Sequence, residues 1–469
     1  MSRWRKALGW TGGLSAYKLL LALARLYILS RRLLPADFGL FALALSILSV
    51  VEIGNDLGFG VGLLNRARIT IREESSLYWF GLGVSTILAG LLAGIGPLLA
   101  SYYESPGLAM VLAGVAVVFW LSALGYQPRL LLRRELRFSE LALQDAVSLT
   151  VGFIITIISA YSGYGVWSLI HGGLIQAALG SGYLLVRRHA RQAIQWHFSW
   201  PEVRPYLRVG LYQTAGQFLN YFSRDLDILL IGKLIGISTL GGYNLVRQIA
   251  RRPLQLVNPI VNQVAAPLLA ADARENKALG PVYLRLVGQI SGFNFPLYAV
   301  GIALAEPLIR FLISADYLVF VPVLRWLCAY FLLRSLYNPV GNLVVATART
   351  RREFWWNVGT VGILALGIYL AGLRGVEWVA AAQFGLFLVL HTAFWWWLIR
   401  PLAAVDFVAY SRAVFSGLPF GLAVGGLCWA GYTLLPAVGA LPDLVILALG
   451  GSLAAGGILL KTKTVTTRK

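Results

Sequence analysis

The chain has 469 residues, of which 58% are hydrophobic and only 13% are charged, and its mean hydropathy is +0.72. Soluble domains carry about 25% charged residues, so the composition excludes a soluble globular protein and indicates an integral membrane protein. The formal net charge of +20 must therefore be interpreted by where the basic residues lie relative to the membrane, and we expect no nucleic-acid partner.

Long apolar runs divide the chain into predicted membrane spans. A bilayer core about 30 Å thick requires roughly 20 apolar residues per helix, and fourteen runs meet this requirement, so we predict an all-α membrane protein with fourteen transmembrane helices. The seventh and eighth runs are the weakest because they carry several charges, and twelve spans is the alternative. The runs lie near residues 10–30, 38–63, 77–100, 108–127, 141–160, 165–186, 206–232, 240–268, 282–304, 321–346, 354–373, 377–399, 412–435 and 442–460.

The basic residues are divided unevenly between the two sides of the membrane. With Met1 in the cytoplasm, the loops on that side and the two termini hold 25 of the 40 Lys and Arg residues, whereas the opposite loops hold five. Cytoplasmic loops carry the excess of positive charge in membrane proteins, so both termini are predicted to be cytoplasmic. Basic clusters such as Arg129, Arg133, Arg134 and Arg137 are interpreted as determinants of orientation or as contacts with anionic lipid head groups.

The sequence offers no catalytic machinery. Outer loops such as SYYESPG at 101–107 are too short for a catalytic domain, and the chain has no P-loop, no HExxH or GxSxG motif and no GxGxxG motif at the start of a helix. Cys328 and Cys428 have no His or Cys neighbour at metal-ligand spacing. His171 and His391 are single residues within apolar runs, which favours hydrogen-bonded core histidines. We therefore expect a transporter without covalent catalysis, metal or organic cofactor.

Two pairs of segments indicate an internal repeat. ADFGLFAL at 36–43 aligns with STLGGYNL at 238–245, and YQP at 126–128 before RRELRF parallels YNP at 337–339 before TRREF. Six spans separate the corresponding helices, and because this number is even, the two halves have the same orientation in the membrane. Their symmetry axis is then expected to run along the membrane normal, with a cleft between the halves. The predicted domains are an N-terminal six-helix bundle at 1–186, a cytoplasmic interfacial linker at 187–205, a C-terminal six-helix bundle at 206–399, and two additional helices with a basic cytoplasmic tail at 400–469.

The predicted thirteenth helix carries three glycines at small-xxx-small spacing, Gly417, Gly421 and Gly425. This spacing permits a close approach between two helices. We expect the partner helix to belong to the same chain, with dimerisation as the alternative.

Several segments resemble a known family. SRRLLPADFGLFALALSILSVVEIGNDLGFGVGLLNR resembles the first two helices of bacterial polysaccharide transporters, the Wzx-type flippases of the multidrug/oligosaccharidyl-lipid/polysaccharide (MOP) exporter superfamily. LLLRRELRFSELALQD and GYGVWSLIHGGLIQA are similar to its colanic-acid-type branch. The resemblance covers roughly residues 10 to 400.

The resemblance implies a MATE-like fold, with two six-helix bundles around a central cavity. It also implies that the protein moves an undecaprenyl-diphosphate-linked oligosaccharide from the cytoplasmic to the outer leaflet of a bacterial or archaeal cell membrane, for lipopolysaccharide, capsule or exopolysaccharide synthesis. Polysaccharide polymerase machinery is then a candidate partner. The alternative within the superfamily is a cation-coupled multidrug exporter, which should have a cavity richer in acids than in bases.

Charged residues inside the predicted spans are the candidate site. A buried Lys or Arg costs roughly 2.5 to 3.5 kcal/mol in a membrane, so such residues are expected to line a wet cavity. Lys18 and Arg25 are seven residues apart, about 10 Å along a helix, and Arg247 and Arg251 are four apart, so each pair shares one face. We predict that these four bind the diphosphate and any acidic sugars, Arg by forked hydrogen bonds and Lys as a point charge.

The intramembrane acids have two possible roles. Asp225 and Asp227 are expected to pair with Arg224 as structural ion pairs. In the alternative to substrate binding, Glu52 or Asp56 pairs with Arg251 or Arg252. Glu52 and Asp56 are also four apart on one helix, and in the alternative interpretation they hold H⁺ or Na⁺ as a coupling ion. If the basic residues also form structural pairs, they would not bind substrate, and the sequence leaves this alternative open.

Overall fold

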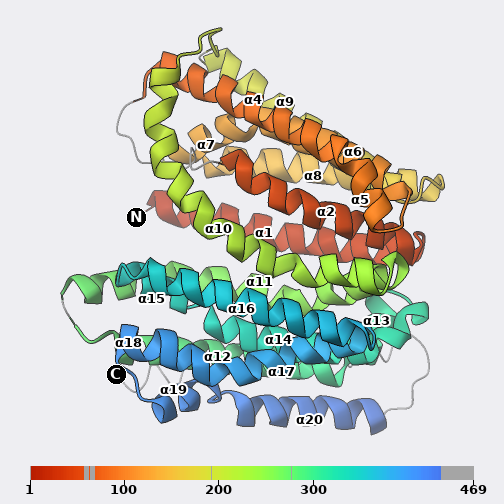
Figure 1. Ribbon diagram of the computed structural model, residues 1–469, viewed down its shortest axis with the longest axis vertical. Coiled ribbons are helices and arrows are strands. Elements are labelled where there is room, and N and C mark those ends of the chain that lie inside the picture. The colour runs from red at the N-terminus through yellow and green to blue at the C-terminus, as the bar shows by residue number, and fades with distance from the viewer. Residues whose placement is uncertain (1, 57–62, 64–68, 192, 276, 435–469) are drawn as a thin grey trace. The chain divides into compact units, whose positions relative to one another are not determined.

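Figure 1 shows the computed structural model of the chain, which describes residues 2–56, 63, 69–191, 193–275 and 277–434. Among these residues the secondary structure is helical, with short turns between helices and no strand. Long apolar runs form helices in a membrane because a helix satisfies its own backbone hydrogen bonds. The predicted fourteenth run, at 442–460, and the basic tail lie outside the described residues.

Ten helical segments are long and apolar enough to cross a membrane, and each coincides with a predicted run. The chain is therefore a multi-pass membrane protein. Three further runs form the long helices α1 (Ser2–Leu29), α10 (Trp200–Leu234) and α11 (Ile237–Arg274), so the total of fourteen stays a prediction. The ten segments are Pro35–Gly54, Ile71–Tyr102, Gly107–Arg134, Phe138–Tyr161, Trp167–Ala190, Leu279–Ala303, Ala315–Ala346, Thr350–Gly372, Val376–Ala403 and Phe407–Leu434.

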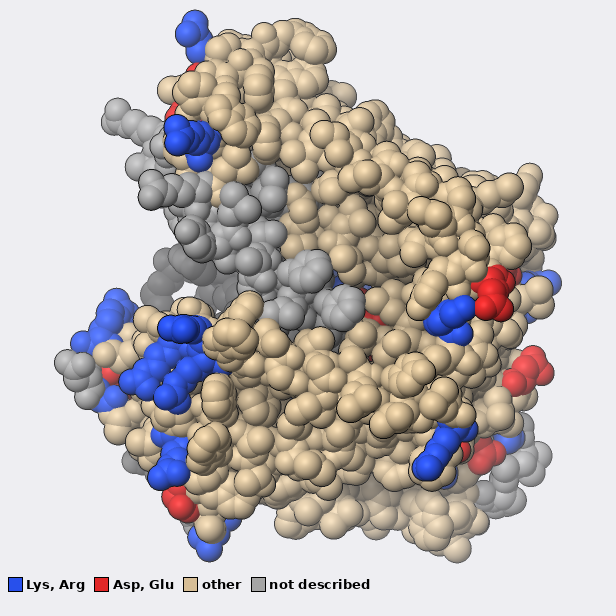
Figure 2. All heavy atoms as spheres, viewed as in Figure 1, with Lys and Arg blue, Asp and Glu red and all other residues tan. Residues whose placement is uncertain are grey.

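Charged side chains lie mainly near the ends of the helices on the face that Figure 2 shows. Other residue types cover the broad middle of that face. Many of the exposed side chains are large and apolar, among them Leu98, Ile158 and Val389. A surface of this kind suits contact with lipid, because apolar side chains are stable there and charged side chains are not.

The first compact unit comprises Met1–Gly241. Helix α8 packs against α9 and α1, α9 packs against α6, and α10 packs against α2 and α4. The α8–α9 contact is close because a Cβ at Gly172 would overlap the Thr156 hydroxyl and the Gly152 carbonyl. The remaining helices of this unit are α2 (Pro35–Asp56), α4 (Ile71–Gly94), α5 (Gly96–Tyr102), α6 (Gly107–Leu124), α7 (Tyr126–Arg134), α8 (Phe138–Tyr161) and α9 (Trp167–Arg191).

The first unit extends beyond residue 186, where we predicted the end of the N-terminal bundle. It includes all of α10, because this helix packs along α2 and α4. An ion pair adds to this attachment: Lys233 Nζ, near the end of α10, lies 2.9 Å from Glu104 Oε1 in the loop after α5. The boundary between the compact units falls between Gly241 and Gly242, and the division into six-helix bundles at 1–186 and 206–399 stays a prediction.

Two glycines of the predicted repeat lie next to each other in the first unit. A Cβ at Gly39 would overlap the carbonyl of Ile237, and a Cβ at Gly241 would overlap the carbonyl of Pro35. The start of α2 therefore touches the start of α11 backbone to backbone, and only glycine leaves room for this contact at either position.

The second compact unit comprises Gly242–Lys469, within which the description ends at residue 434. Helix α12 packs against α14, α19 and α20, and α17 packs against α14 and α16. Besides most of α11, the described helices are α12 (Leu279–Ala303), α13 (Ala305–Leu312), η1 (Ala315–Phe320), α14 (Val321–Tyr337), α15 (Val340–Ala346), α16 (Thr350–Gly372), α17 (Val376–Phe394), η2 (Trp395–Ile399), α18 (Arg400–Ala403), α19 (Phe407–Val414) and α20 (Leu418–Leu434).

The three glycines at small-xxx-small spacing pack within the chain, as predicted. Gly421 and Gly425 of α20, and Gly417 just before it, face Phe295, Ala299 and Ser291 of α12, respectively. A Cβ at Gly421 would lie 2.9 Å from the Phe295 Cβ. The backbones of α20 and α12 therefore approach too closely for a larger residue on this face of α20.

This contact gives a stability prediction. Gly421→Leu should destabilise the second unit by about 1–3 kcal/mol, because overpacking a tight contact costs this much. Gly426→Leu is the matched control on the same helix, since a Cβ at Gly426 meets nothing within 4 Å. Thermal denaturation of the purified protein in detergent measures the difference, and equal melting temperatures for the two variants would contradict the close α12–α20 contact.

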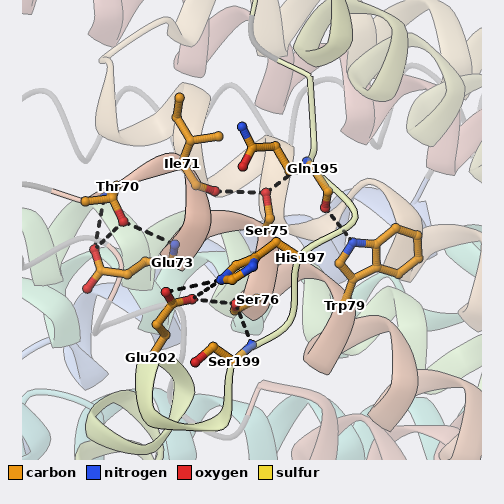
Figure 3. A network of polar contacts seen from close by, with 10 residues as sticks. All are labelled: Thr70, Ile71, Glu73, Ser75, Ser76, Trp79, Gln195, His197, Ser199 and Glu202. Carbon is orange, nitrogen blue, oxygen red and sulfur yellow. Dashed lines mark hydrogen bonds and ion pairs between the residues drawn. The ribbon is translucent and has the colours of Figure 1, made fainter.

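The segment between α9 and α10 is tied to the first turns of α4 (Figure 3). The backbone N–H of Gln195 donates to Ser75 Oγ at 3.0 Å, and the Trp79 indole N–H donates to the backbone carbonyl of Gln195 at 2.9 Å. The Trp196 ring stacks on Trp79 with 4.4 Å between ring centroids. The described part of the predicted linker at 187–205 is thus fixed to the first unit by hydrogen bonds and ring stacking.

Glu202, in the first turn of α10, completes this attachment (Figure 3). The Ser76 hydroxyl donates to Glu202 Oε2 at 2.6 Å and accepts from the Ser199 amide at 3.0 Å. His197 Nε2 lies 3.3 Å from the same carboxylate. The hydrogen bond from Ser76, with a smaller effect of His197, holds the pKa of Glu202 below its ordinary value.

A group with a lowered pKa stabilises the folded state above its ordinary pKa and loses this effect as the pH falls through the folded-state value. We therefore expect the backbone N–H of Gln195 to lose protection from hydrogen exchange as the pH falls. The measured exchange rates are first corrected for the pH dependence of exchange in an unfolded chain. Glu202→Gln should weaken protection at neutral pH and make it independent of pH in the acid range. Glu377→Gln, at an exposed glutamate, is the control. An unchanged pH dependence in Glu202→Gln would contradict the role of this carboxylate.

Candidate functional site

A cavity of about 530 Å³ lies inside the first unit, between α1, α2, α6, α7, α8 and α9. Among the described residues, four charged side chains line it: Lys18 and Arg25 from α1, Arg129 from α7 and Asp145 from α8. Three bases against one acid give the lining a formal charge of +2. The two basic residues predicted for the first span therefore do line a common cavity.

Asp145 holds two of these bases at once. Its Oδ2 atom lies 2.8 Å from Lys18 Nζ, and its Oδ1 atom lies 2.8 Å from Arg129 Nη2. Arg129 Nη2 also donates to Gln144 Oε1 at 3.0 Å. The side chains of Lys18, Arg129 and Asp145 are 45%, 30% and 14% exposed, so Lys18 is the most accessible member of the cluster. One carboxylate thus neutralises only one of two neighbouring positive charges.

Arg25 has a different environment from Lys18. It lies two helical turns further along α1 and is partly buried, about 10 Å away along the axis. Within the described part of the chain, Arg25 makes no hydrogen bond or ion pair. An arginine without a counterion in a membrane cavity favours an anion or water there, because its charge is costly in an apolar environment.

Arg247 and Arg251 belong to α11 in the second unit. Arg247 is 5% exposed and Arg251 is partly buried. The two are one helical turn apart, as the sequence predicts. That they face the same substrate as Lys18 and Arg25 stays a prediction.

The acids proposed for structural pairing lie close to the basic residue Arg224 or inside the bundle. Arg224 Nη2 lies 3.1 Å from Asp225 Oδ2, whereas Asp227 is buried and its Oδ1 accepts from the Ile228 amide at 3.0 Å. The positive charge of Arg224 also acts on Glu52, on the neighbouring helix α2. The side chain of Asp56 lies outside the described residues. The pairing of Glu52 or Asp56 with Arg251 or Arg252 stays a prediction.

The sequence did not assign three of the polar residues in this cavity to a binding site, although it counts Asp145 among the acids within the spans. Arg129 was grouped with the orientation-determining cluster, although Leu130, Leu131 and Leu132 separate it from Arg133. Gln144 and Asp145 end the segment LLLRRELRFSELALQD, which carries part of the family resemblance. Both the apolar spacer and the shared segment were signals that these residues have a role inside the membrane.

The two lone histidines have hydrogen-bonding partners, as predicted. His171 Nδ1 lies 2.8 Å from Ser159 Oγ within the first unit. His391, in the second unit, lies 3.3 Å from both the Tyr337 hydroxyl and Ser411 Oγ. Within the described residues, no group of three or more His, Cys, Asp or Glu side chains is arranged to hold a metal ion.

A multi-pass helical protein with a polar, cationic cavity inside a helix bundle is of the membrane-transporter class. Its fold is similar to a solved structure described as lipid II flippase MurJ in the inward closed conformation, with a TM-score of 0.73, 14% identity and coverage of 97% of this chain and 99% of that chain. The family described as "Polysaccharide biosynthesis protein" matches residues 28–322, which is more than half of the chain. The chain therefore belongs to this polysaccharide biosynthesis family.

Two curated relatives agree with this membership. The chain is 27% identical over 412 residues to the lipopolysaccharide biosynthesis protein WzxC of Escherichia coli strain K12, covering 86% of this chain and 82% of that protein. It is 26% identical over 375 residues to the teichuronic acid biosynthesis protein TuaB of Bacillus subtilis strain 168, covering 79% of this chain and 77% of that protein. The resemblance to Wzx-type flippases of the MOP superfamily is confirmed.

Proposed function

We propose that the chain is a flippase that moves an undecaprenyl-diphosphate-linked oligosaccharide from the cytoplasmic to the outer leaflet for cell-surface polysaccharide synthesis. The observation that carries the proposal is a cavity with three bases and one acid in a member of a polysaccharide biosynthesis family. A diphosphate is anionic and binds to arginine by charge-assisted hydrogen bonds. Transport proceeds by alternating access between two six-helix bundles, and no covalent step is assigned to the chain.

A cation-coupled multidrug exporter is the alternative function. Such an exporter needs acidic side chains where a cationic drug binds. The described cavity of the first unit has one acid, Asp145, and both of its oxygens already contact cations. The charge of the cavity thus favours an anionic substrate.

We also propose the membrane in which the chain lies, its coupling ion and its partners. The chain lies in the cytoplasmic membrane of a bacterium or archaeon with fourteen spans, both termini in the cytoplasm and polysaccharide polymerase machinery as a partner. Its basic loops contact anionic lipids. H⁺ or Na⁺ is the candidate coupling ion, and Glu52 and Asp56 are its candidate ligands. Asp145 is unsuited to that role because Lys18 and Arg129 already neutralise its carboxylate.

The orientation predicts the location of two loops. A reporter fused after Gln195 should lie in the cytoplasm and one fused after Ser105 should lie outside, because 25 basic residues are on the first side and five on the other. Alkaline phosphatase, which is active only outside the cytoplasm, should therefore be inactive in the first fusion and active in the second. The reverse pattern would contradict the orientation.

Substrate export predicts a specific effect of the cavity arginine. Arg25→Gln should lower export about tenfold to hundredfold, since a hydrogen bond to a charged group is worth about 1.5–3 kcal/mol, and Arg25→Lys should restore part of it because lysine keeps the charge but not the planar fork. Arg251→Gln in the second unit should act in the same direction. Surface polysaccharide and accumulated lipid-linked glycan are measured in a deletion strain that carries each variant.

Protein abundance and an exposed arginine provide the controls for this experiment. Arg351 is exposed, so Arg351→Gln should leave export and abundance unchanged. If Arg25 formed a structural contact instead, Arg25→Gln would lower the amount of protein in the membrane. Normal export by a stable variant that lacks Lys18, Arg25, Arg247 and Arg251 would overturn their assignment to the substrate.

A further inference from the structure

We propose that the second unit has a site for one anionic phospholipid, in which Arg349, Arg352 and Arg400 bind the phosphate of the head group. The occupant is a lipid of the surrounding membrane with a net negative charge, represented by phosphatidylglycerol. This site is separate from the cavity of the first unit, and its ligand is not the transported substrate. It is also more specific than a general contact of basic loops with anionic lipids, because particular side chains hold one head group.

Two backbone carbonyls orient two of these arginines. Arg352 Nη1, in the first turn of α16, donates to the Trp397 carbonyl at 3.4 Å, and Arg349 Nη1 donates to the Pro401 carbonyl at 3.1 Å. The Trp397 carbonyl is available because its α-helical donor would be the N–H of Pro401, which proline lacks. The Pro401 carbonyl belongs to the last turn of α18, where carbonyls have no partner within the helix. The end of α18 therefore fixes both guanidinium groups beside it.

No described residue neutralises the charge of this cluster. Carbonyl oxygens are neutral acceptors, and Arg349, Arg352 and Arg400 form no ion pair within the described part of the chain. Arg400 lies between the two accepting carbonyls in the sequence, and all three arginines are exposed. In Figure 2, Lys and Arg side chains gather at this end of the second unit, where Figure 1 shows α15 and α18. A guanidinium has five N–H donors, so each arginine keeps donors for an anion.

Two tryptophans place the cluster at the membrane interface. The π-helix η2 brings Trp396 and Trp397 to the surface, where they are 58% and 39% exposed. The Trp397 indole N–H donates to the backbone carbonyl of Arg352 at 3.2 Å, which holds this ring beside the arginine. Tryptophan is enriched at the level of the lipid head groups. The arginines therefore lie at the depth of the lipid phosphates.

One face of α16 continues from Arg352 along the lipid-facing surface. Gly359, Ile363, Leu366 and Leu370 follow Arg352 at helical spacing on this face, and all are exposed. Arg352 and Leu370 are about 27 Å apart along the axis, close to the bilayer core thickness of about 30 Å. A Cβ at Gly359 would meet nothing within 4 Å, which leaves room for an acyl chain. The face thus matches a phospholipid, with its head group at Arg352 and a chain along α16.

The charge of the cluster selects an anionic lipid over a zwitterionic one. Glu353 is the acid nearest in the sequence, and it forms no ion pair with the three arginines. The positive group of a zwitterionic head group would meet repulsion there, whereas a phosphate accepts forked hydrogen bonds from arginine. In the predicted orientation this end of the unit faces the cytoplasm, and the cytoplasmic leaflet is the one that carries negative surface charge.

The experiment measures binding of phosphatidylglycerol to the purified full-length protein in detergent by native mass spectrometry, with phosphatidylcholine as the comparison lipid. Wild-type protein should prefer phosphatidylglycerol. Arg352→Gln should weaken its binding about tenfold, since a hydrogen bond to a charged group is worth at least this factor, and Arg352→Lys should restore part of it. Arg400→Gln should also weaken binding. This second change breaks no described side-chain hydrogen bond, so the variant should fold.

Arg351→Gln is the matched control. Arg351 is exposed on the same turn of α16, but it points about 100° away from Arg352 around the helix and makes no described hydrogen bond to η2 or α18. The variant removes the same charge, yet phosphatidylglycerol should bind to it as to wild type. Equal losses in Arg351→Gln and Arg352→Gln would show a diffuse attraction and overturn the site. Equal affinity of wild type, Arg352→Gln and Arg400→Gln would overturn it as well.

Thermal denaturation separates lipid binding from a purely structural role. A ligand that binds the folded state stabilises it, so phosphatidylglycerol should raise the melting temperature of wild type and Arg351→Gln more than that of Arg400→Gln. An equal rise in all three would contradict the site.

Export of surface polysaccharide separates this site from the proposed function. Weaker phosphatidylglycerol binding by Arg352→Gln in a strain with normal export supports the lipid site and leaves the flippase function intact. Lost export by a stable Arg352→Gln variant that still binds phosphatidylglycerol as wild type does would assign the arginine to the transported substrate and overturn the lipid site.

Discussion

The ionic cluster around Asp145 is the interaction on which the first unit depends. A charged side chain within a membrane is costly unless it meets an opposite charge, water or a ligand. Asp145 meets Lys18 from α1 and Arg129 from α7, so a single carboxylate joins three helices. Removal of one partner from a buried ion pair leaves an uncompensated charge, which costs more than the pair contributes. The cluster therefore fixes the relative positions of α1, α7 and α8.

The same cluster leaves an excess of positive charge in the cavity, which favours an anion there. With one acid for three bases, ion pairing within the described lining is incomplete, and Arg25 has no described carboxylate partner. Complete neutralisation would have made a more stable bundle with no preference for an anion. Under the proposed function, this charge imbalance would link the packing of the first unit to the binding of an anionic substrate.

Around α12, the second unit uses neutral polar contacts instead. Asn294 of α12 donates to Ser335 of α14 at 2.7 Å, and Ser291 donates to the Val414 carbonyl at 2.7 Å. The row of glycines on α20 lets this helix approach the same face of α12. Neutral hydrogen bonds and small residues are the usual means by which helices associate in lipid, where apolar side chains give no preference for a partner helix.

The sequence by itself determined the membrane class, the helical fold and the family, because these depend on the length of apolar runs and on short segments such as ADFGLFAL. It also predicted that Lys18 and Arg25 share a face, since helical spacing is local. Only the tertiary structure decided that Asp145 pairs with Lys18 and Arg129, that Arg129 faces a cavity, and that α10 belongs to the first unit. Lys18 and Asp145 are 127 residues apart, and their contact depends on how each helix is rotated about its axis, which packing between helices sets.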